Sequence, residues 1–284
     1  MVVVSPPSEV ETRRPARGRV GNLLGRLLLV LLLLAVVAGG AWALSRFDRR
    51  SPQFADPPFP VPFQQVEPGS QAPEQGGQVP TSQQPQASPA QQSAGVEPLE
   101  AWARQMAEKT DIPVRALRAY AMADLLMRAQ SPACRISWAT LAGIGRVESH
   151  HGTIGGLRLG EDGRPSDPII GIPLDGRPGV KAIPDSDGGT LDGDTQWDRA
   201  VGPMQFIPTT WARYAVRANG DGNSPDPQNI DDAALAAARY LCSGNRDLAT
   251  GEGWWAAVLT YNQSVEYGQN VFSGADAYAR ASTP

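Results

Sequence analysis

The apolar and polar residues in the second half of the chain recur at helical spacing. Apolar positions three or four residues apart run through several segments, as expected for helices with one buried face. Pro113 and Pro208 stand where a first helical turn favours proline, and Ser137 is placed to cap the helix that follows it. The expected helices are Leu99–Lys109, a run from Pro113 to Leu126, Trp138–Ser149, a short helix from Pro208 to Tyr214, Ala233–Cys242 and Trp254–Tyr261.

Between His151 and Asp198 this pattern gives way to a stretch dense in Gly, Pro and Asp. It contains only short apolar pieces, such as Ile169–Ile172, which could make a small hairpin. Loops of this length inside a compact domain are uncommon and usually functional, often as the wall of a cleft. The expected fold class is therefore α+β and mostly helical, with a small hairpin or long loop beside the helices.

The N-terminal part contains one uncharged apolar stretch, Leu27–Leu44, which follows five arginines. As a helix this stretch would rise about 27 Å, close to the ~30 Å hydrocarbon core of a bilayer. Arg46, Arg49 and Arg50 follow the stretch, so the excess of arginine before it is modest, and this excess favours a cytoplasmic N-terminus. We therefore expect residues 1–22 to be a cytoplasmic basic tail and residues 23–45 to be a transmembrane signal anchor, with the rest of the chain outside.

A cleaved signal peptide is the alternative, because Ala41-Trp42-Ala43 resembles a cleavage site. Both interpretations export the remainder of the chain. Residues 46–97 are rich in Pro and Gln and offer too little apolar surface to offset the entropy lost on ordering. They are predicted to be a disordered linker that leads to one folded domain over residues 98–284.

The charge and the cysteine content argue against two classes of function, nucleic-acid binding and zinc binding. The formal net charge is −4, which argues against nucleic acid as a partner, since proteins that bind it carry a basic face. Cys134 and Cys242 form no CxxC pair and no Cys/His cluster, so a zinc site is not expected. In an exported domain the two cysteines could form a disulfide, and two buried free thiols are the alternative.

Glu148 is the strongest candidate for chemistry. The predicted helix ahead of it is apolar and ends directly after it. A carboxyl group there lies beside apolar neighbours and at the negative end of the helix dipole, and both influences raise its pKa. A carboxylic acid with a raised pKa can protonate a leaving oxygen. From spacing alone, a solvated glutamate at a helix end remains the alternative.

Three sequence blocks in order resemble lytic murein transglycosylases. They are Glu148-Ser149 with Gly152 after an apolar helix, Ala200–Pro208, which resembles an AxGPMQFxP block, and Leu259–Ser264, which resembles a late YN block. Asn219–Gly222 and the following Ile230–Ala233 resemble the membrane-bound lytic transglycosylase B group in particular. The resemblance covers about residues 137 to 270 and implies a lysozyme-like fold.

The resemblance also implies a reaction. Glu148 would protonate the oxygen between N-acetylmuramic acid and N-acetylglucosamine in peptidoglycan, then take the proton of the muramoyl 6-hydroxyl as a 1,6-anhydro ring closes. No cofactor is needed, and the domain would act on the cell-wall side of a bacterial cell membrane. The residues expected to line the substrate cleft are Gln205, Tyr261, Asn262, Gln196, Trp197 and Ser149, with Gln196 at a position where relatives often carry a small hydroxyl residue.

Several alternatives stay open. Asn219, Asp221 and Asn223 are weak candidates for a Ca²⁺ site, because the loop lacks the Asp spacing and closing Glu of an EF-hand, and a plain turn is the simpler interpretation. A muramidase that hydrolyses the same bond would need a second carboxylate, for which the sequence offers Asp185, Asp187, Asp192, Asp194 and Asp198. A non-catalytic module that binds or organises the wall is the remaining alternative.

Overall fold

The computed structural model describes residues 59–71 and 89–283, with side chains in the second range from residue 98 onward. Both ranges belong to one compact unit, Asp56–Pro284. The predicted basic tail, the predicted signal anchor and much of the predicted linker lie outside the described residues. Within the described ranges no helix is long and apolar enough to span a bilayer.

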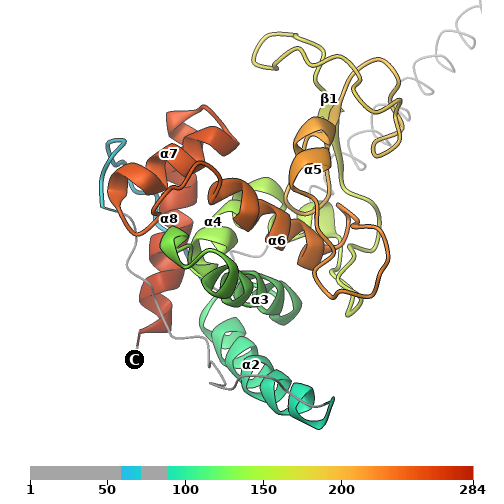
Figure 1. The fold of residues 1–284 in the computed structure, drawn as a ribbon. Coiled ribbons are helices and arrows are strands. Elements are labelled where there is room, and N and C mark those ends of the chain that lie inside the picture. Colours follow the sequence, from blue (N-terminus) through green and yellow to red (C-terminus); the bar gives the residue numbers. More distant parts are fainter. Residues whose placement is uncertain (1–58, 72–88, 284) are drawn as a thin grey trace, which may run out of the picture. The chain divides into compact units, whose positions relative to one another are not determined.

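Seven α-helices and a two-stranded sheet make up the described ranges (Figure 1). This confirms a mostly helical α+β class. The elements are α2 (Pro89–Lys109), α3 (Val114–Gln130), η1 (Pro132–Cys134), α4 (Trp138–Ser149), η2 (Ile154–Gly156), β1 (Ile170–Pro173), β2 (Arg199–Val201), α5 (Pro208–Tyr214), α6 (Ile230–Leu241), α7 (Gly251–Tyr261) and α8 (Val265–Ser282), where η marks a short 3₁₀ helix. Every helix expected from the sequence is present, but α2 begins ten residues early and α8 was not predicted.

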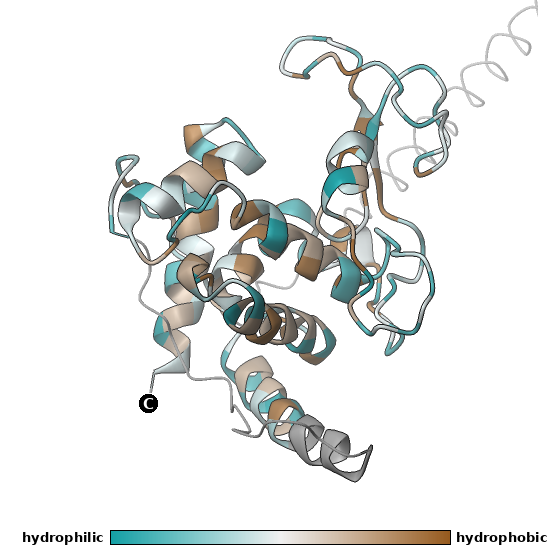
Figure 2. Ribbon diagram, viewed as in Figure 1, coloured by the Kyte–Doolittle hydropathy of each residue, from teal (hydrophilic) through white to brown (hydrophobic). Residues whose placement is uncertain are grey.

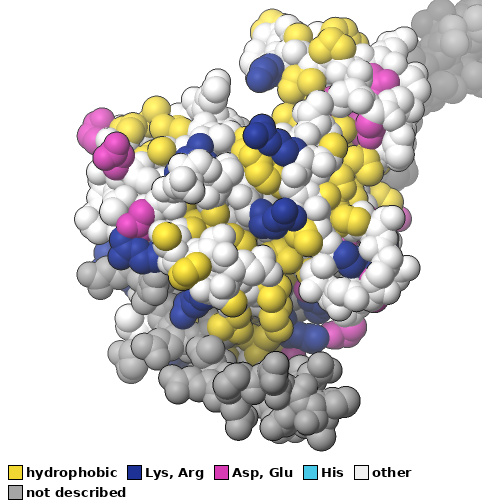
Figure 3. Space-filling model, in the orientation of Figure 1, with side chains coloured by type: hydrophobic (Ala, Val, Ile, Leu, Met, Phe, Trp, Pro, Cys, Tyr) yellow, Lys and Arg dark blue, Asp and Glu magenta, His cyan; other side chains and the backbone are white. Residues whose placement is uncertain are grey.

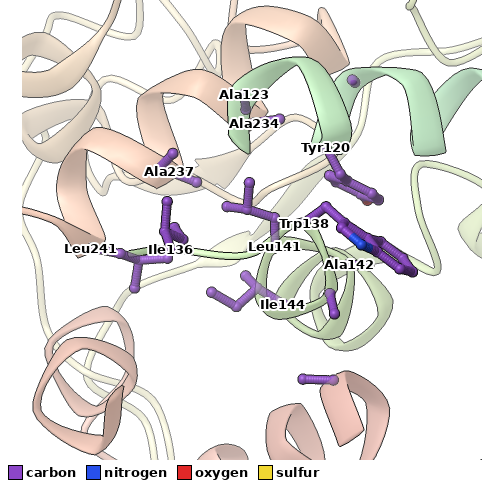
Figure 4. Packing of buried hydrophobic residues seen from close by; sticks show 14 of the residues in the cluster. Tyr120, Ala123, Ile136, Trp138, Leu141, Ala142, Ile144, Ala234, Ala237 and Leu241 are labelled. Carbon is purple, nitrogen blue, oxygen red and sulfur yellow. The ribbon is translucent and has the colours of Figure 1, made fainter. Parts of the chain in front are cut away.

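The middle of the core is α4. Its residues Trp138, Leu141 and Ile144 are fully buried and point into the apolar cluster shown in Figure 4. Each such side chain contributes about 1.5–3 kcal/mol relative to an exposed position. Figure 2 shows many hydrophobic residues along the packed helices, whereas the loops around β1 are mostly hydrophilic.

Both ends of α4 are fixed by specific groups. Ser137 caps the N-terminus, as its spacing predicts, by accepting a hydrogen bond from the Thr140 backbone N–H. The buried carboxylate of Asp124 accepts a second one from the Trp138 N–H at 2.9 Å. At the other end His150 adopts a left-handed conformation with φ of 47°. Such caps satisfy backbone groups that the helix leaves unpaired, so the direction of the last turn, which carries Glu148, is well defined.

The unpredicted helix α8 packs directly on α4. A Cβ atom at Gly143 would lie 2.6 Å from the carbonyl oxygen of Val271 and 3.2 Å from the Cβ of Ala275. Only glycine at this position lets the two helices approach so closely. Small residues are common in α8, but its buried residues Tyr267, Val271, Phe272, Ala275 and Tyr278 recur at helical spacing. The sequence therefore carried a signal for this helix that the prediction did not use.

The hairpin expected between His151 and Asp198 forms differently from the prediction. Strand β1 holds the apolar run but pairs antiparallel with β2, with Ile170 opposite Val201 and Pro173 opposite Arg199. The long stretch therefore closes against the beginning of the Ala200–Pro208 block. This pairing brings the loop and that block together on one side of the helices (Figure 1).

Residues 59–71 correct the prediction of a continuous disordered linker. This segment, called the strap below, lies on α8: the Gln64 backbone N–H donates to the Ser273 hydroxyl at 2.7 Å, and Phe59 stacks on Tyr278 with ring centroids 5.9 Å apart. Gln269 of α8 donates to the Val66 carbonyl at 3.0 Å. Composition did not predict the strap because it has only three partly buried apolar residues on a Pro-rich background, Phe59, Val61 and Val66. They are enough to dock the segment because a helix face is available to pack against.

The strap is expected to contribute to the stability of the domain. In a fragment of residues 56–284, replacing Phe59 by alanine should lower the free energy of unfolding by about 1–2 kcal/mol, because half-buried apolar surface is lost. Phe63 in the same strap is 58% exposed and provides the matched control, for which no measurable change is expected. Thermal unfolding of the two variants checks this. Equal melting temperatures would contradict a docked strap.

A disulfide links Cys134 in η1 to Cys242 directly after α6, across a sequence separation of 108 residues. The sequence left free thiols as the alternative, and the structure selects the bonded pair. Beside it, the Leu248 backbone N–H donates to the Cys134 carbonyl at 2.8 Å. The segment that leads into α4 is thereby attached to the distant chain between α6 and α7.

Candidate active site

Glu148 lies in the last turn of α4 and receives a short hydrogen bond from α8. The Tyr267 hydroxyl donates to Glu148 Oε1 at 2.6 Å. Tyr267 is 8% exposed, whereas Glu148 keeps partial access to solvent. The close α4–α8 packing creates this pair. Tyr267 was not predicted because α8 was not, although Tyr267 begins the helical spacing of buried residues in that helix and stands only six residues after Tyr261.

Burial raises the pKa of Glu148 to about 7, and the hydrogen bond from Tyr267 opposes this by favouring the charged form. The upward shift of this pKa agrees with the prediction from the apolar residues that precede Glu148 in the sequence. Near neutral pH the group is therefore divided between carboxylic acid and carboxylate. A group in this condition can both donate and accept a proton, as acid–base catalysis requires.

Tyr261 connects α7 to the turn after β2. Its hydroxyl donates to the Met204 carbonyl at 2.7 Å, and its ring meets Phe206 edge-on with centroids 5.9 Å apart. Burial first, and then the nearby charge of Glu148, raise the pKa of Tyr261 well above its usual range. The tyrosine therefore stays neutral and its ring lies close to the candidate acid.

Gln205 sits in a tight turn that its neighbours force. Its φ is 49°, and Gly202 has a φ of 78°. A Cβ at Gly202 would lie 1.8 Å from the Pro227 carbonyl oxygen, so this position needs glycine. The Gln205 Nε2 donates to the Gly202 carbonyl at 3.0 Å, which holds the amide against its own turn. Its Oε1 accepts no hydrogen bond from the described residues and faces Gly171 of β1.

The position of Ser149 corrects one expectation. Its side chain is fully buried, donates to the Pro203 carbonyl at 2.6 Å and accepts from the Gly152 N–H at 2.8 Å. The hydroxyl therefore has no free face for substrate. It joins the end of α4, which carries Glu148, to the Ala200–Pro208 block, which carries Gln205.

The remaining predicted cleft residues are at least partly exposed. Asn262 caps α7, and its Oδ1 accepts from the Ser264 N–H at 3.2 Å. Gln196 lines an open polar hollow of about 380 Å³ together with Thr195 and Arg199. Trp197 is half-buried next to it. No described hydrogen bond, ion pair or ring contact joins Gln196 or Trp197 to Glu148, so their substrate roles remain predictions.

The aspartates of the long loop are engaged in holding that loop. Asp185 Oδ1 accepts three backbone N–H groups, from residues 187, 188 and 189. Asp198 is fully buried and accepts from both the backbone and the hydroxyl of Ser186. Asp192 and Asp194 likewise accept from backbone N–H groups. A carboxylate that holds a loop together in this way is not free to activate a water molecule.

The Asn219–Asn223 loop does not fit a Ca²⁺ site. Both oxygens of Asp221 accept from the Arg217 guanidinium, at 2.9 and 2.8 Å, and the amides of Asn219 and Asn223 also donate to Asp221. The guanidinium lowers the pKa of the Asp221 carboxyl well below its usual range. Arg217 supplies the positive charge that balances the Asp221 carboxylate, so a plain turn without a metal ion is the better interpretation of this loop.

His151 has a structural position beneath the site. It is buried between two tyrosines, with Nδ1 3.1 Å from the Tyr120 hydroxyl and Nε2 3.1 Å from the Tyr278 hydroxyl. Burial lowers its pKa to about 3, so the ring is neutral. Tyr278 donates onward to Asp111 at 2.8 Å. This chain of hydrogen bonds holds His151 in place two residues after the end of α4.

Part of the chain matches a known protein family. Residues 190–271 match the Transglycosylase SLT domain. The matched segment contains Gln205, Tyr261 and Tyr267 but begins after Glu148. The hydrogen bond from Tyr267 therefore connects the matched segment to the candidate acid outside it.

No curated protein matches the chain. Two solved structures of the Escherichia coli lytic transglycosylase Slt35 resemble it, one in complex with bulgecin A and one with calcium. Identity is 16% in both, and 64% of this chain is covered. The match covers 78% of the first Slt35 chain with a TM-score of 0.34 and 79% of the second with a TM-score of 0.33.

Proposed function

We propose that the protein is a peptidoglycan lytic transglycosylase with Glu148 as its single catalytic acid and base. The observation that carries the proposal is the Glu148–Tyr267 pair: a carboxyl group with a pKa of about 7, hydrogen-bonded by a residue of the segment that matches the Transglycosylase SLT domain. Tyr261 of α7 is near enough to Glu148 for the carboxylate charge to raise the pKa of the tyrosine, and its hydroxyl donates to the carbonyl of Met204, the residue before Gln205.

The mechanism needs only one carboxyl group. In its protonated form Glu148 donates to the glycosidic oxygen as the β-1,4 bond from N-acetylmuramic acid to N-acetylglucosamine breaks. The resulting carboxylate accepts the proton of the muramoyl 6-hydroxyl, whose oxygen bonds to C1 and closes the 1,6-anhydro ring. The internal hydroxyl replaces the water or enzyme nucleophile that other glycosidases obtain from a second carboxylate.

Hydrolysis by a muramidase is the second candidate, and the long-loop aspartates argue against it. Their oxygens accept backbone hydrogen bonds within the loop, and none contacts Glu148 in the described ranges. Mass spectrometry of the fragments that residues 56–284 release from purified peptidoglycan distinguishes the two reactions. The proposal predicts 1,6-anhydro ends, whereas reducing ends would support hydrolysis. Wall binding without release of any fragment would support a non-catalytic module.

The wider setting is also part of the proposal. Residues 23–45 would anchor the protein in a bacterial cell membrane, with the catalytic domain on the cell-wall side. Membership of the membrane-bound lytic transglycosylase B group is proposed on the Asn219–Gly222 and Ile230–Ala233 runs.

The pH dependence of cleavage is expected to report Glu148. Bond breaking needs the protonated acid, so kcat/KM should fall as pH rises through about 7. In Tyr267→Phe the hydrogen bond that favours the carboxylate is lost, so this fall should move to higher pH, and the maximal rate should drop about tenfold. Initial rates between pH 5 and 9 check this.

Glu266→Gln is the control for the pH profile, since Glu266 is the exposed carboxylate directly before Tyr267. It should leave the fall in kcat/KM where the parent protein has it. A profile that stays unchanged in Tyr267→Phe, or one that moves in Glu266→Gln, would contradict the assignment of this titration to Glu148.

A further inference from the structure

Three tyrosines from three helices form a row that leads away from Glu148. Tyr261 of α7 lies 5.5 Å from Tyr240 of α6, and Tyr240 lies 4.7 Å from Tyr214 of α5, measured between ring centroids. All three residues are partly exposed. Their rings offer a continuous aromatic surface that begins next to the candidate acid and ends at the C-terminus of α5.

Two guanidinium groups border this tyrosine row. Arg213 lies over the ring of Tyr214, with its central carbon 5.5 Å from the ring centroid. Arg246 reaches the row from the other side: its Nη2 donates to the Thr260 hydroxyl at 3.0 Å, and the Tyr240 hydroxyl donates to the Thr260 carbonyl at 2.8 Å. Both arginines lie near enough to lower the pKa of Tyr240, against the larger effect of burial.

These arginines have no acidic partner in the part of the chain that the structure describes. Most described arginines pair with a carboxylate, as Arg217 does with Asp221. The described arginines without an ion pair are Arg146, Arg158, Arg213, Arg239 and Arg246, and three of the five lie at this tyrosine row. Figure 3 shows Lys or Arg side chains in the middle of the visible face with no Asp or Glu side chain directly beside them, whereas the acidic residues of α6, Asp231 and Asp232, are in its first turn. In a chain with a net charge of −4, such a local excess of positive charge indicates an anionic ligand.

The third arginine has a different task. Arg239 Nη1 donates to the carbonyls of Tyr214 and Ala215, at 3.1 and 3.4 Å. Cationic side chains at a helix C-terminus satisfy its last carbonyls in this way. Arg239 therefore holds the end of α5 in place. Arg246 Nη1 likewise donates to the Leu241 carbonyl and the Ser243 hydroxyl, both at 3.4 Å. These longer contacts are to neutral groups and leave the charge of Arg246, like that of Arg213, without a carboxylate in the described ranges.

We propose that Arg213 and Arg246 form a subsite for the carboxylates of the peptidoglycan peptide stems, beside saccharides that pack on the tyrosine row. The inference rests on the proposed function and specifies its substrate as strands whose stem carboxylates are free. Guanidinium groups bind carboxylates through paired hydrogen bonds, whereas neutral saccharides need no charge. A phosphate-rich wall polymer would also be attracted, but nothing requires such a polymer to lie beside Tyr261 and the candidate acid.

The test measures binding rather than cleavage, so that it does not depend on turnover. Full-length protein carrying Glu148→Gln, in non-ionic detergent, is sedimented with purified peptidoglycan freed of phosphate polymers by hydrofluoric acid. Half of the wall sample has its carboxylates converted to neutral amides. The untreated wall should bind roughly tenfold more tightly than the amidated wall at low salt, and the preference should shrink at high salt.

Adding Arg213→Gln and Arg246→Gln should abolish this preference, whereas Arg158→Gln should preserve it. Arg158 is an exposed arginine without an ion pair in the described ranges and gives the same change in charge elsewhere. The measured quantity is the ratio of one variant's affinities for the untreated and the amidated wall. Partial unfolding lowers both affinities by the same factor and therefore does not change the ratio.

Three outcomes would overturn the inference: equal binding to both walls, a preference that survives the double substitution, or a preference that appears only when phosphate polymers remain. Failure of the proposed function would be seen separately, as wild-type protein that leaves both walls uncut.

Discussion

Replacing Glu148 by glutamine is expected to lower the rate of glycan cleavage by about a thousandfold or more, the range for loss of a general acid and base. Glutamine has the same size and can still accept the hydrogen bond of Tyr267 at 2.6 Å, but it cannot transfer a proton. Release of soluble fragments from purified peptidoglycan measures the effect. Glu252→Gln, at an exposed glutamate in the first turn of α7, is the matched control and should keep full activity.

The same variant should not be less stable than the parent protein. The folded-state pKa of Glu148 is raised, so its favourable contribution exists at low pH and is lost as pH rises through about 7, when a charge must be held in an apolar place. Glutamine carries no charge. At pH 8 the variant should therefore melt at the parent temperature or above it, and a large drop would mean that inactivity reflects unfolding instead.

Reduction of the Cys134–Cys242 disulfide should cause the largest loss of stability. Closing a loop of about 100 residues contributes up to about 4.7 kcal/mol in the chain-entropy model, and removing a native disulfide typically costs 2–5 kcal/mol. For a domain of this size, that lowers the melting temperature by roughly 10 °C. Differential scanning calorimetry of residues 56–284, with and without a reductant, measures the change.

The double variant Cys134→Ala/Cys242→Ala separates the bond from other effects of the reductant. It should melt near the temperature of the reduced parent, and the reductant should not change it. Well below the transition both proteins should keep their activity, because the bond lies at the start of α4 and Glu148 lies at its end. Insensitivity of the parent protein to reduction would contradict a stabilising disulfide.

The sequence predicts the parts of this fold that depend on local signals. Ser137 as a cap, proline at the start of α5 and apolar spacing in α4 were each enough to place a helix. The raised pKa of Glu148 was also predicted from local sequence, because the apolar residues that precede it belong to the same helix, α4.

The parts that the sequence did not predict depend on contacts between distant segments. Helix α8 was not predicted although Tyr267, Val271 and Tyr278 recur at helical spacing, and its close packing on Gly143 of α4 cannot be seen from spacing. Without α8, neither Tyr267 nor a docking face for the strap could be foreseen. Ser149 looked like a cleft residue because its neighbour is the candidate acid, yet a helix turns successive side chains by about 100°, which directs this hydroxyl to the buried Pro203 carbonyl.

Cleavage in heavy-oxygen water tests the central claim most directly, because a lyase that uses the substrate's own hydroxyl consumes no water. Peptidoglycan strands are digested by residues 56–284 in that solvent, and each new muramoyl end is weighed. The proposed mechanism, with Glu148 acting alone, predicts ends that are lighter by one water than hydrolysis products and free of the label. One labelled oxygen at each new end would contradict it and would require a second group that activates water.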